Sequence, residues 1–377
     1  MPIYLDNAAS TMPRPEVLEF VLQCERVYAN PSSMHSAGVE ACAMVNTARR
    51  SIAKNINAQP GEIYFTSGGT EANNLALQGV MEAMESRKTH LIVSQIEHPS
   101  ILNTAKYLES INYDVSYIPV DGNGIVNIDT LENAITENTA IISVMFANNE
   151  IGSVQPILKI ARLAKSKGVL FHTDAVQAIG HLDIDVDELG IDLMSISGHK
   201  IYAPKGVGAL YVRRGVELQP LLHGGNQESG LRSGTQNTMG IIGMGKAVEL
   251  LSKSKISDRK HVCALRDIFV DGLKNMDVQI NSPDNGLCNI VNVSFRGVDG
   301  EALFNALNDA GVYVSRTCAC SSKSGNVSHV LKAIGVDGDL AQSAIRFSFG
   351  RYSTEDEVRE ALHRLGTILD QLRYQAH

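Results

Sequence analysis

Three segments of the sequence place polar or charged residues directly after a run of apolar ones. In the first, residues 65–74, a strand-like run leads into Gly68-Gly69-Thr70 and then into a helical pattern. Glycine lets the backbone approach an anion closely, and a helix N-terminus presents free N–H groups, so this pattern fits a phosphate site. It fits a tight turn capped by Thr70 equally well. It is neither a Walker A loop nor a dinucleotide fingerprint.

The second and third segments supply a carboxylate and an amine. Asp174 ends an apolar run, and Lys200 follows the run 193–197 through Gly198-His199. A strand-end aspartate is more often a helix cap, and most lysines are solvated. The alternative is chemical: such a carboxylate can pair with the cationic ring nitrogen of a pyridinium cofactor. A lysine held near the edge of a sheet and partly removed from water has a lowered pKa and can form a Schiff base.

The cysteines divide into two groups, and the chain contains Cys24, Cys42, Cys263, Cys288, Cys318 and Cys320. Their scatter is no disulfide framework, and we expect the first four to be buried or incidental thiols. Cys318-Ala319-Cys320 lies in a polar stretch where a thiol is exposed, and exposed thiols usually have a function. A metal site is the other interpretation of Cys-x-Cys, but no second motif accompanies it, so we predict no metal.

Strands and helices alternate over the first 250 residues, which predicts a mainly parallel, doubly wound sheet. After Thr235 we expect a long helical stretch to about Met276, broken near Ser257-Asp258, and then a smaller α+β region. We therefore predict a large domain over residues 15–250 and a small domain made of residues 1–14 and 251–377. The predicted strands of the large domain are 62–66, 90–94, 114–118, 140–146, 169–172, 193–197 and 207–212. Those of the small domain are 288–295, 313–315 and 344–349.

Composition is ordinary for a globular enzyme, with 44% hydrophobic and 20% charged residues. The formal charge of −8 and the absence of long like-charged runs give no indication of a nucleic-acid or anionic-membrane surface. No stretch reaches the ~18 apolar residues of a membrane helix, and the start of the chain has no basic region typical of a signal peptide. We expect a cytoplasmic protein.

Taken together, the segments resemble the class V group of fold-type I pyridoxal-phosphate enzymes, and more narrowly cysteine desulfurases of the NifS/IscS type. The resemblance runs from one end of the chain to the other and implies the α/β fold-type I architecture. Its motifs are Leu5-Asp6-Asn7-Ala8-Ala9, Asn30-Pro31-Ser32-Ser33 with His35, Thr66-Ser67-Gly68-Gly69-Thr70-Glu71, Glu97-His98, residues 147–152, His172-Thr173-Asp174-Ala175-Val176-Gln177, Ser197-Gly198-His199-Lys200, His223-Gly224-Gly225, Arg232-Ser233-Gly234-Thr235 and residues 345–351.

The resemblance implies a role for each candidate residue around pyridoxal 5'-phosphate. Lys200 would hold the cofactor covalently, Asp174 would pair with the pyridinium nitrogen, and Gln177 would hydrogen-bond the phenolic oxygen. His98 would stack on the ring and act in catalysis. Asn149 would lie at both cofactor and substrate, and Arg346 would bind the substrate carboxylate. The alternative for Arg346 is a strand-end ion pair, which we prefer for Arg351. The implied phosphate ligands are Gly69, Thr70, Ser197, His199 and, from the partner subunit of a homodimer, Thr235.

The cysteine segment departs from the family pattern, in which Gly-Ser-Ala precedes the nucleophile. Here Thr317-Cys318-Ala319 precedes Cys320, which matches the nucleophile, while Cys318 is an unusual neighbour. The implied reaction takes sulfur from L-cysteine, leaves L-alanine and forms a Cys320 persulfide for an acceptor protein. Similar enzymes supply iron–sulfur clusters, tRNA thiolation and DNA sulfur modification. The alternatives are a selenocysteine lyase, another class V aminotransferase or a non-catalytic thiol or metal-binding protein.

Overall fold

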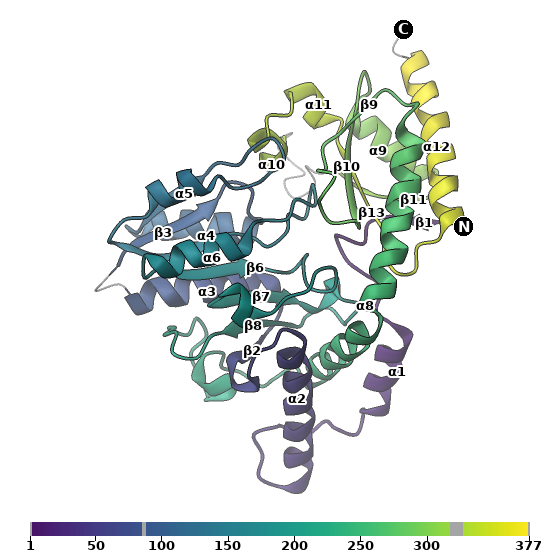
Figure 1. Cartoon of the computed structure of the whole chain (residues 1–377). Helices are drawn as coiled ribbons and strands as arrows, with labels where there is room; N and C mark the ends of the chain where they lie inside the picture. The colour runs from purple at the N-terminus through teal and green to yellow at the C-terminus, as the bar shows by residue number, and fades with distance from the viewer. Residues whose placement is uncertain (1, 85–87, 317–326, 376–377) are drawn as a thin grey trace.

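The computed structural model describes residues 2–84, 88–316 and 327–375 (Figure 1). Its larger sheet has seven strands, and most of them coincide with the predicted ranges. These strands are β2 (Ile63–Thr66), β3 (His90–Ser94), β4 (Asp114–Ile118), β5 (Thr139–Ser143), β6 (Leu170–Asp174), β7 (Leu193–Ser197) and β8 (Gly208–Val212).

Strand order in this sheet is β2-β8-β7-β6-β5-β3-β4. The four pairs from β7 to β4 are parallel, whereas β8 runs antiparallel to both β7 and β2. The predicted mainly parallel sheet is confirmed. Because β2 has the same direction as β3, β5, β6 and β7, the C-terminal ends of these five strands share one edge. Ligands bind at this edge in open α/β sheets.

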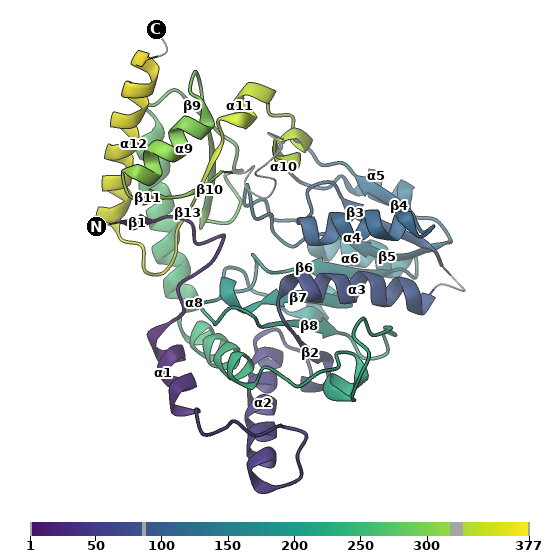
Figure 2. The same ribbon diagram turned by 180° about the vertical axis from the view of Figure 1, so that it is seen from behind.

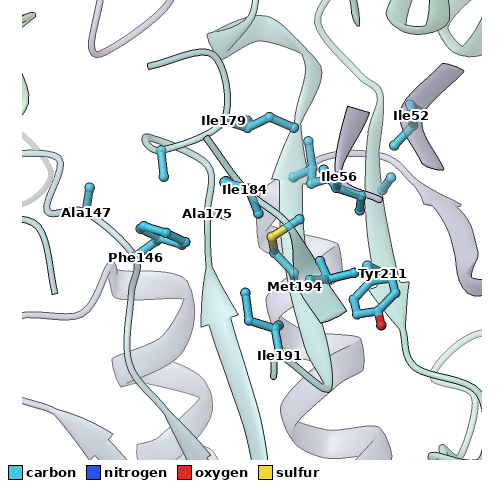
Figure 3. Packing of buried hydrophobic residues seen from close by; sticks show 14 of the residues in the cluster. Ile52, Ile56, Phe146, Ala147, Ala175, Ile179, Ile184, Ile191, Met194 and Tyr211 are labelled. Atoms are coloured by element: carbon cyan, nitrogen blue, oxygen red, sulfur yellow. The ribbon is translucent and has the colours of Figure 1, made fainter. Parts of the chain in front are cut away.

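Helices cover both faces of the sheet, and neighbouring residues along each strand divide between them. Leu91 of β3 joins a core with α3 and α4, whereas Ile92 joins a second core with α2 and α6. Figure 3 shows this second core around Met194 and Tyr211, with Ile52 contributed by α2. Burial on both faces explains the continuous apolar runs of these strands. The helices are α1 (Pro15–Gln23), α2 (Ser36–Asn55), α3 (Gly69–Met84), α4 (Pro99–Ser110), α5 (Ile128–Ala134), α6 (Ile157–Ser166) and α7 (Val186–Leu189), with short 3-10 turns η1 (Pro60–Glu62), η2 (Gly198–Lys200) and η3 (Gln227–Gly230).

A smaller α+β part follows, as predicted (Figure 2). It has a hydrophobic core of its own. Phe269 lies at its centre, with ring centroids 4.6 Å from Phe347 and 5.4 Å from Phe349. The predicted strand at 313–315 is in fact two short strands that belong to different sheets. The elements are β1 (Ile3–Tyr4), α8 (Thr238–Leu273), β9 (Val278–Ile280), β10 (Ile290–Phe295), α9 (Gly300–Asp309), β11 (Val312–Tyr313), β12 (Ser315–Arg316), α10 (His329–Ala333), α11 (Gly338–Gln342), β13 (Ile345–Ser348) and α12 (Glu355–Gln375).

The long helix α8 joins the two cores. Its first half contributes Met244 to the sheet core and its second half contributes Phe269 to the smaller one. The predicted break near Ser257-Asp258 is wrong, because α8 is a single helix from Thr238 to Leu273. Ser257 Oγ donates to the carbonyl of Ser254 one turn earlier, so its hydroxyl bonds back onto the helix. The domain limits at residues 14–15 and 250–251 stay a prediction.

One expectation about the cysteines is wrong. Cys263 of α8 and Cys288, two residues before β10, are not incidental thiols but form a disulfide bond. Cys24 is a buried free thiol and Cys42 a half-buried one, as expected. Among the helices of the described residues, none is long and apolar enough to cross a membrane.

Candidate active site

One cavity of about 400 Å³ lies at the sheet edge where the five strands end. Ser315, Arg316 and Arg346, from the smaller α+β part, complete its wall. Ten of the residues predicted for the site converge there from separate elements. The lining includes Gly69, Thr70, His98, Asn149, Asp174, Gln177, Ser197, His199, Lys200 and Arg346.

A chain of hydrogen bonds links Asp174 to His98 beneath this cavity. Asp174, the buried last residue of β6, accepts from the Asn73 side chain at 2.7 Å and from the Val176 N–H at 2.9 Å. Asn73 also donates to Ser100 Oγ at 2.8 Å, and that hydroxyl lies 2.8 Å from His98 Nδ1. Sequence analysis missed Asn73 and Ser100. Asn73 could have been found from its spacing, because it follows Gly69 by one helical turn on the helix that begins at the cavity.

His98 is a neutral imidazole whose tautomer its neighbours define. The backbone N–H of Ser100 donates to His98 Nδ1 at 3.1 Å, so that nitrogen accepts and the ring proton is on Nε2. Burial lowers the pKa of His98, and the nearby Asp174 carboxylate opposes that shift. His98 also caps α4, which explains why the ring is fixed at the cavity rather than free to rotate.

Lys200 lies at the end of η2, where its amine meets the N-terminal segment of the chain. Its Nζ donates to the carbonyls of Ala8 and Ala9, and Gln177 Nε2 donates to the Ala8 carbonyl at 2.9 Å. Sequence analysis quoted residues 5–9 as a motif without a role for any of them. The structure shows that the turn at Ala8 and Ala9 forms one wall of the cavity.

The part of the cavity at the start of α3 is suited to an anion. Helix α3 begins at Gly69, so its free N–H groups face the space lined by Thr70, Ser197 and His199. A Cβ on Gly69 would lie 2.8 Å from Val176 Cγ2, so the close approach requires glycine. Burial and the neighbouring lysines lower the pKa of His199 to about 4, which leaves it neutral.

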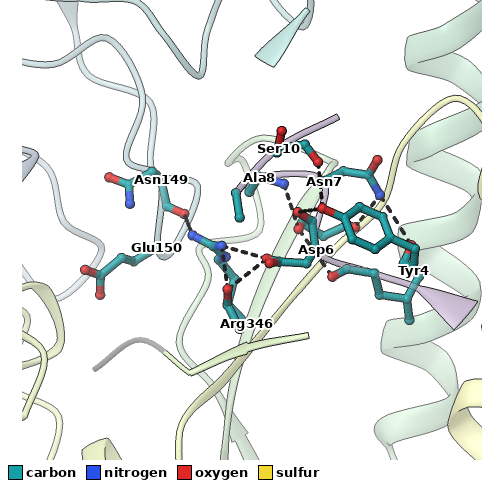
Figure 4. Close-up of polar contacts among 12 residues, drawn as sticks. Tyr4, Asp6, Asn7, Ala8, Ser10, Asn149, Glu150 and Arg346 are labelled. Atoms are coloured by element: carbon teal, nitrogen blue, oxygen red, sulfur yellow. Dashed lines mark hydrogen bonds and ion pairs between the residues drawn. The ribbon is translucent and has the colours of Figure 1, made fainter. Parts of the chain in front are cut away.

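Arg346 approaches the cavity from β13 and is held on two sides (Figure 4). Its Nη1 donates to the Asn149 carbonyl at 2.9 Å, and its Nη2 lies 2.8 Å from Asp6 Oδ1. Nη2 also donates to Ser315 Oγ at 3.0 Å. Both interpretations of Arg346 therefore meet at one residue, since it lines the cavity and is ion-paired.

Two buried glutamates accompany the site, and sequence analysis assigned a role to neither. Glu150 lines the cavity and accepts from Ser328 Oγ, while burial raises its pKa to about 7. Glu97 accepts from Ser94 Oγ and from the Met145 N–H, and burial raises its pKa to about 8. Both carboxyls therefore hold protons at pH values where exposed glutamates are ionised.

The raised pKa of Glu97 predicts a pH dependence of stability. In the unfolded chain this carboxyl ionises near 4.5, whereas the folded protein keeps the proton to about pH 8. Unfolding therefore releases a proton between these values, and the free energy of unfolding falls as pH rises through that window. Glu97→Gln cannot ionise, so we expect nearly equal stability at about pH 4, below the unfolded pKa, and a gain on the order of a few kcal/mol at pH 8.

Denaturant unfolding of both proteins at several pH values measures this difference. Glu301→Gln is the control, because that side chain is 72% exposed and its removal should leave the pH dependence unchanged. If the stability difference between Glu97→Gln and the unmodified protein stays constant from about pH 4 to pH 8, Glu97 does not titrate as described.

Of the predicted site residues that the structure describes, Thr235 is not brought into this cavity. It is exposed, although Arg232 of the same segment binds Glu71 at 2.8 Å near the start of α3. Cys320, like Cys318, lies outside the described residues. No group of three or more His, Cys, Asp or Glu that could hold a metal occurs within the described parts of the chain.

The family model for aminotransferase class-V matches residues 3–361 of this sequence. The chain belongs to the class-V aminotransferase family. Within the family, it is 45% identical over 375 residues to a protein of Dictyoglomus turgidum named cysteine desulfurase IscS, covering 98% of this chain and 95% of that one. A solved structure named NifS-like protein is 41% identical, with a TM-score of 0.94, and covers 99% of this chain and 100% of its own. A structure titled SspA in complex with cysteine is 39% identical, with a TM-score of 0.85, and covers 93% of this chain and 100% of its own.

Proposed function

We propose that this chain is a pyridoxal-phosphate-dependent cysteine desulfurase, which removes sulfur from L-cysteine and carries it as a persulfide on Cys320. The observation that carries the proposal is the gathering of Lys200, Asp174, His98 and Arg346 around one cavity. The 45% identity to a protein named cysteine desulfurase IscS supports the choice of substrate.

The donor set of the cavity fits pyridoxal 5'-phosphate. The cofactor offers a carbonyl carbon, a basic ring nitrogen, a phenolic oxygen and a phosphate, and the cavity offers an amine, a buried carboxylate, an amide and a helix N-terminus. Lys200 would bind the carbonyl carbon, Asp174 the ring nitrogen and Gln177 the phenolic oxygen. The phosphate would lie at Gly69, Thr70, Ser197 and His199. Bound in this way, the cofactor supplies an electron sink for the bond electrons at the substrate Cα.

The chain's own residues then move protons and hold the substrate. Lys200 would take the Cα proton at Nζ. His98 carries its proton on Nε2 and lines the same cavity, so it is placed to exchange a proton with the reacting groups. Asn149 and Arg346 hold the substrate carboxylate, which orients Cα relative to Lys200.

Sulfur transfer is the step assigned to Cys320. Its thiolate attacks the substrate sulfur, the S–S bond forms, and the Cβ–S bond breaks with its electron pair remaining on the carbon skeleton. Protonation of that carbon gives L-alanine, so one L-cysteine and one thiol yield one L-alanine and one persulfide. An acceptor protein then receives the sulfur.

The test is product analysis with purified, cofactor-loaded protein. L-cysteine should give L-alanine and reductant-released sulfide in equal amounts, at a rate above that with L-selenocysteine or with a keto-acid acceptor. Transamination without sulfide, or turnover of L-selenocysteine alone, would contradict the proposal and favour a class V aminotransferase or a selenocysteine lyase.

We also propose a homodimer in which Thr235 of one subunit reaches the phosphate site of the other. Its support is the exposure of Thr235, together with the Arg232–Glu71 pair that holds its segment beside the start of α3. Thr235→Ala should weaken cofactor retention by about 1.5–3 kcal/mol, the value of a hydrogen bond to a charged group. Cofactor titration of the apo-protein measures this loss. A monomer that binds the cofactor at full strength would overturn the assignment.

A further inference from the structure

The N-terminal segment contacts both Lys200 and Arg346 of the proposed site. Its acidic residue, Asp6, has no role in the chemistry proposed above. The backbone turn after Asp6 carries Ala8 and Ala9, whose carbonyls accept from Lys200. That turn is closed by the N–H of Ala9, which donates to the Asp6 carbonyl at 3.0 Å. The Asp6 side chain points the other way, toward Arg346 (Figure 4).

Asp6, Ser315 and Arg346 form a closed group of three. Asp6 Oδ1 lies 2.8 Å from Arg346 Nη2 and accepts from Ser315 Oγ at 2.8 Å, while Ser315 Oγ accepts from Arg346 Nη2 at 3.0 Å. The side chains of Arg346 and Asp6 are only 9% and 19% exposed. Pairing in such a site is strong, because water screens it weakly.

Two strands and the segment that follows β1 bring this group together from distant parts of the sequence. Asp6 forms a bridge to Ser348, at the end of β13, and Ser315 of β12 is the direct partner of Arg346 in the antiparallel ladder. The Asn149 carbonyl, from the large sheet side, holds Nη1 of the same guanidinium at 2.9 Å. Both terminal nitrogens of the guanidinium are therefore held by other groups of the protein.

We propose that Asp6 is a positioning residue that, with Ser315, holds the Arg346 guanidinium in place for the α-carboxylate of the substrate. A free arginine side chain samples many rotamers, and fixing it in advance removes that cost from binding. Asp6 also balances the buried charge of Arg346 while the site is empty of substrate. This inference rests on the proposed function, because it takes Arg346 as the carboxylate ligand.

The experiment compares two ligands that differ only in the group Arg346 would bind. L-alanine, the proposed product, carries a carboxylate, and L-alaninamide carries a neutral amide in its place. Titration calorimetry of the cofactor-loaded protein gives the ratio of their dissociation constants, which is the selectivity for carboxylate. Asp6→Ala should lower that selectivity at least about tenfold. Asp6→Asn, which retains an acceptor oxygen, should keep it within about threefold.

Asp258→Ala is the matched control. Asp258 is also 19% exposed and also pairs with arginines, Arg14 at 3.1 Å and Arg351 at 3.4 Å, but it does not line the cavity. Its loss should lower stability and leave the selectivity unchanged. Unchanged selectivity in Asp6→Ala, or an equal fall in Asp6→Ala and Asp258→Ala, would overturn the positioning role. So would a loss in Asp6→Asn as large as in Asp6→Ala.

Two further variants complete the design. Ser315→Ala removes one of the two side chains that hold Nη2 and should lower the selectivity about threefold. It gives the same test if Asp6→Ala does not fold, and unchanged selectivity there contradicts the proposal. Arg346→Ala distinguishes failure of the proposed function from failure of the positioning role alone. If it leaves selectivity intact, the proposed function has lost its carboxylate ligand. If it abolishes selectivity while the Asp6 and Ser315 variants retain it, only the positioning role fails.

Discussion

Lys200→Ala is expected to abolish turnover of L-cysteine while leaving part of the cofactor affinity. The amine is proposed both to hold the cofactor and to take the Cα proton, so its loss removes two functions at once. Loss of a residue that acts in this way lowers rate by roughly 10⁴-fold. The anion site at Gly69, Thr70 and His199 remains intact, so the variant should still bind the cofactor non-covalently.

Borohydride reduction followed by peptide mapping identifies the lysine that bears the cofactor. The label should be on Lys200 in the unmodified protein and absent from Lys200→Ala. Lys205→Ala is the control, since this exposed lysine lies five residues further on and outside the cavity lining. A label on Lys205 or any other lysine would contradict the assignment.

Cys320→Ser should lose desulfuration by a comparable factor but keep its interaction with L-cysteine. A serine hydroxyl is far less nucleophilic than a thiolate at neutral pH, whereas Lys200, Asp174 and Arg346 are untouched. The substrate should therefore still perturb the visible absorbance of the bound cofactor, while neither sulfide nor L-alanine accumulates. Steady-state assays and absorbance titration measure the two effects separately.

Cys318→Ser is the matched control for this variant, because it makes the same change two residues away. It also places serine where the resembling family has it, so we expect desulfuration to remain largely active. Loss of activity in Cys318→Ser with retention in Cys320→Ser would show that the nucleophile is Cys318.

The large sheet and the main cavity residues were predictable because their signals are local. Asp174 and Lys200 each follow an apolar run, and parallel strands that end at one edge bring such residues together. The same reasoning places Gly69 at a strand-to-helix turn. Periodicity and the geometry of a parallel sheet account for the places of these residues, whereas their chemical roles were implied by the family resemblance.

The features that sequence analysis missed depend on tertiary contacts. Asp6 meets Arg346 because the segment after β1 bridges to Ser348 at the end of β13, and the disulfide joins Cys263 to a cysteine 25 residues away. The polar pair at Ser257-Asp258 indicated a helix break, but Asp258 is held by Arg14 and Arg351, and the helix continues. Such contacts override local propensity, so a single sequence does not reveal them.

Mass spectrometry of the cysteine peptide shows directly whether sulfur from L-cysteine moves to Cys320. The cofactor-loaded protein is incubated with sulfur-isotope-labelled L-cysteine, treated with an alkylating agent and digested without reductant. We expect one labelled sulfur atom attached to Cys320 in the unmodified protein and in Cys318→Ser. The label should be absent from both Cys320→Ser and Lys200→Ala. Labelled sulfur on Cys318 alone, or L-alanine formed in Cys320→Ser at the unmodified rate, would contradict sulfur transfer to Cys320.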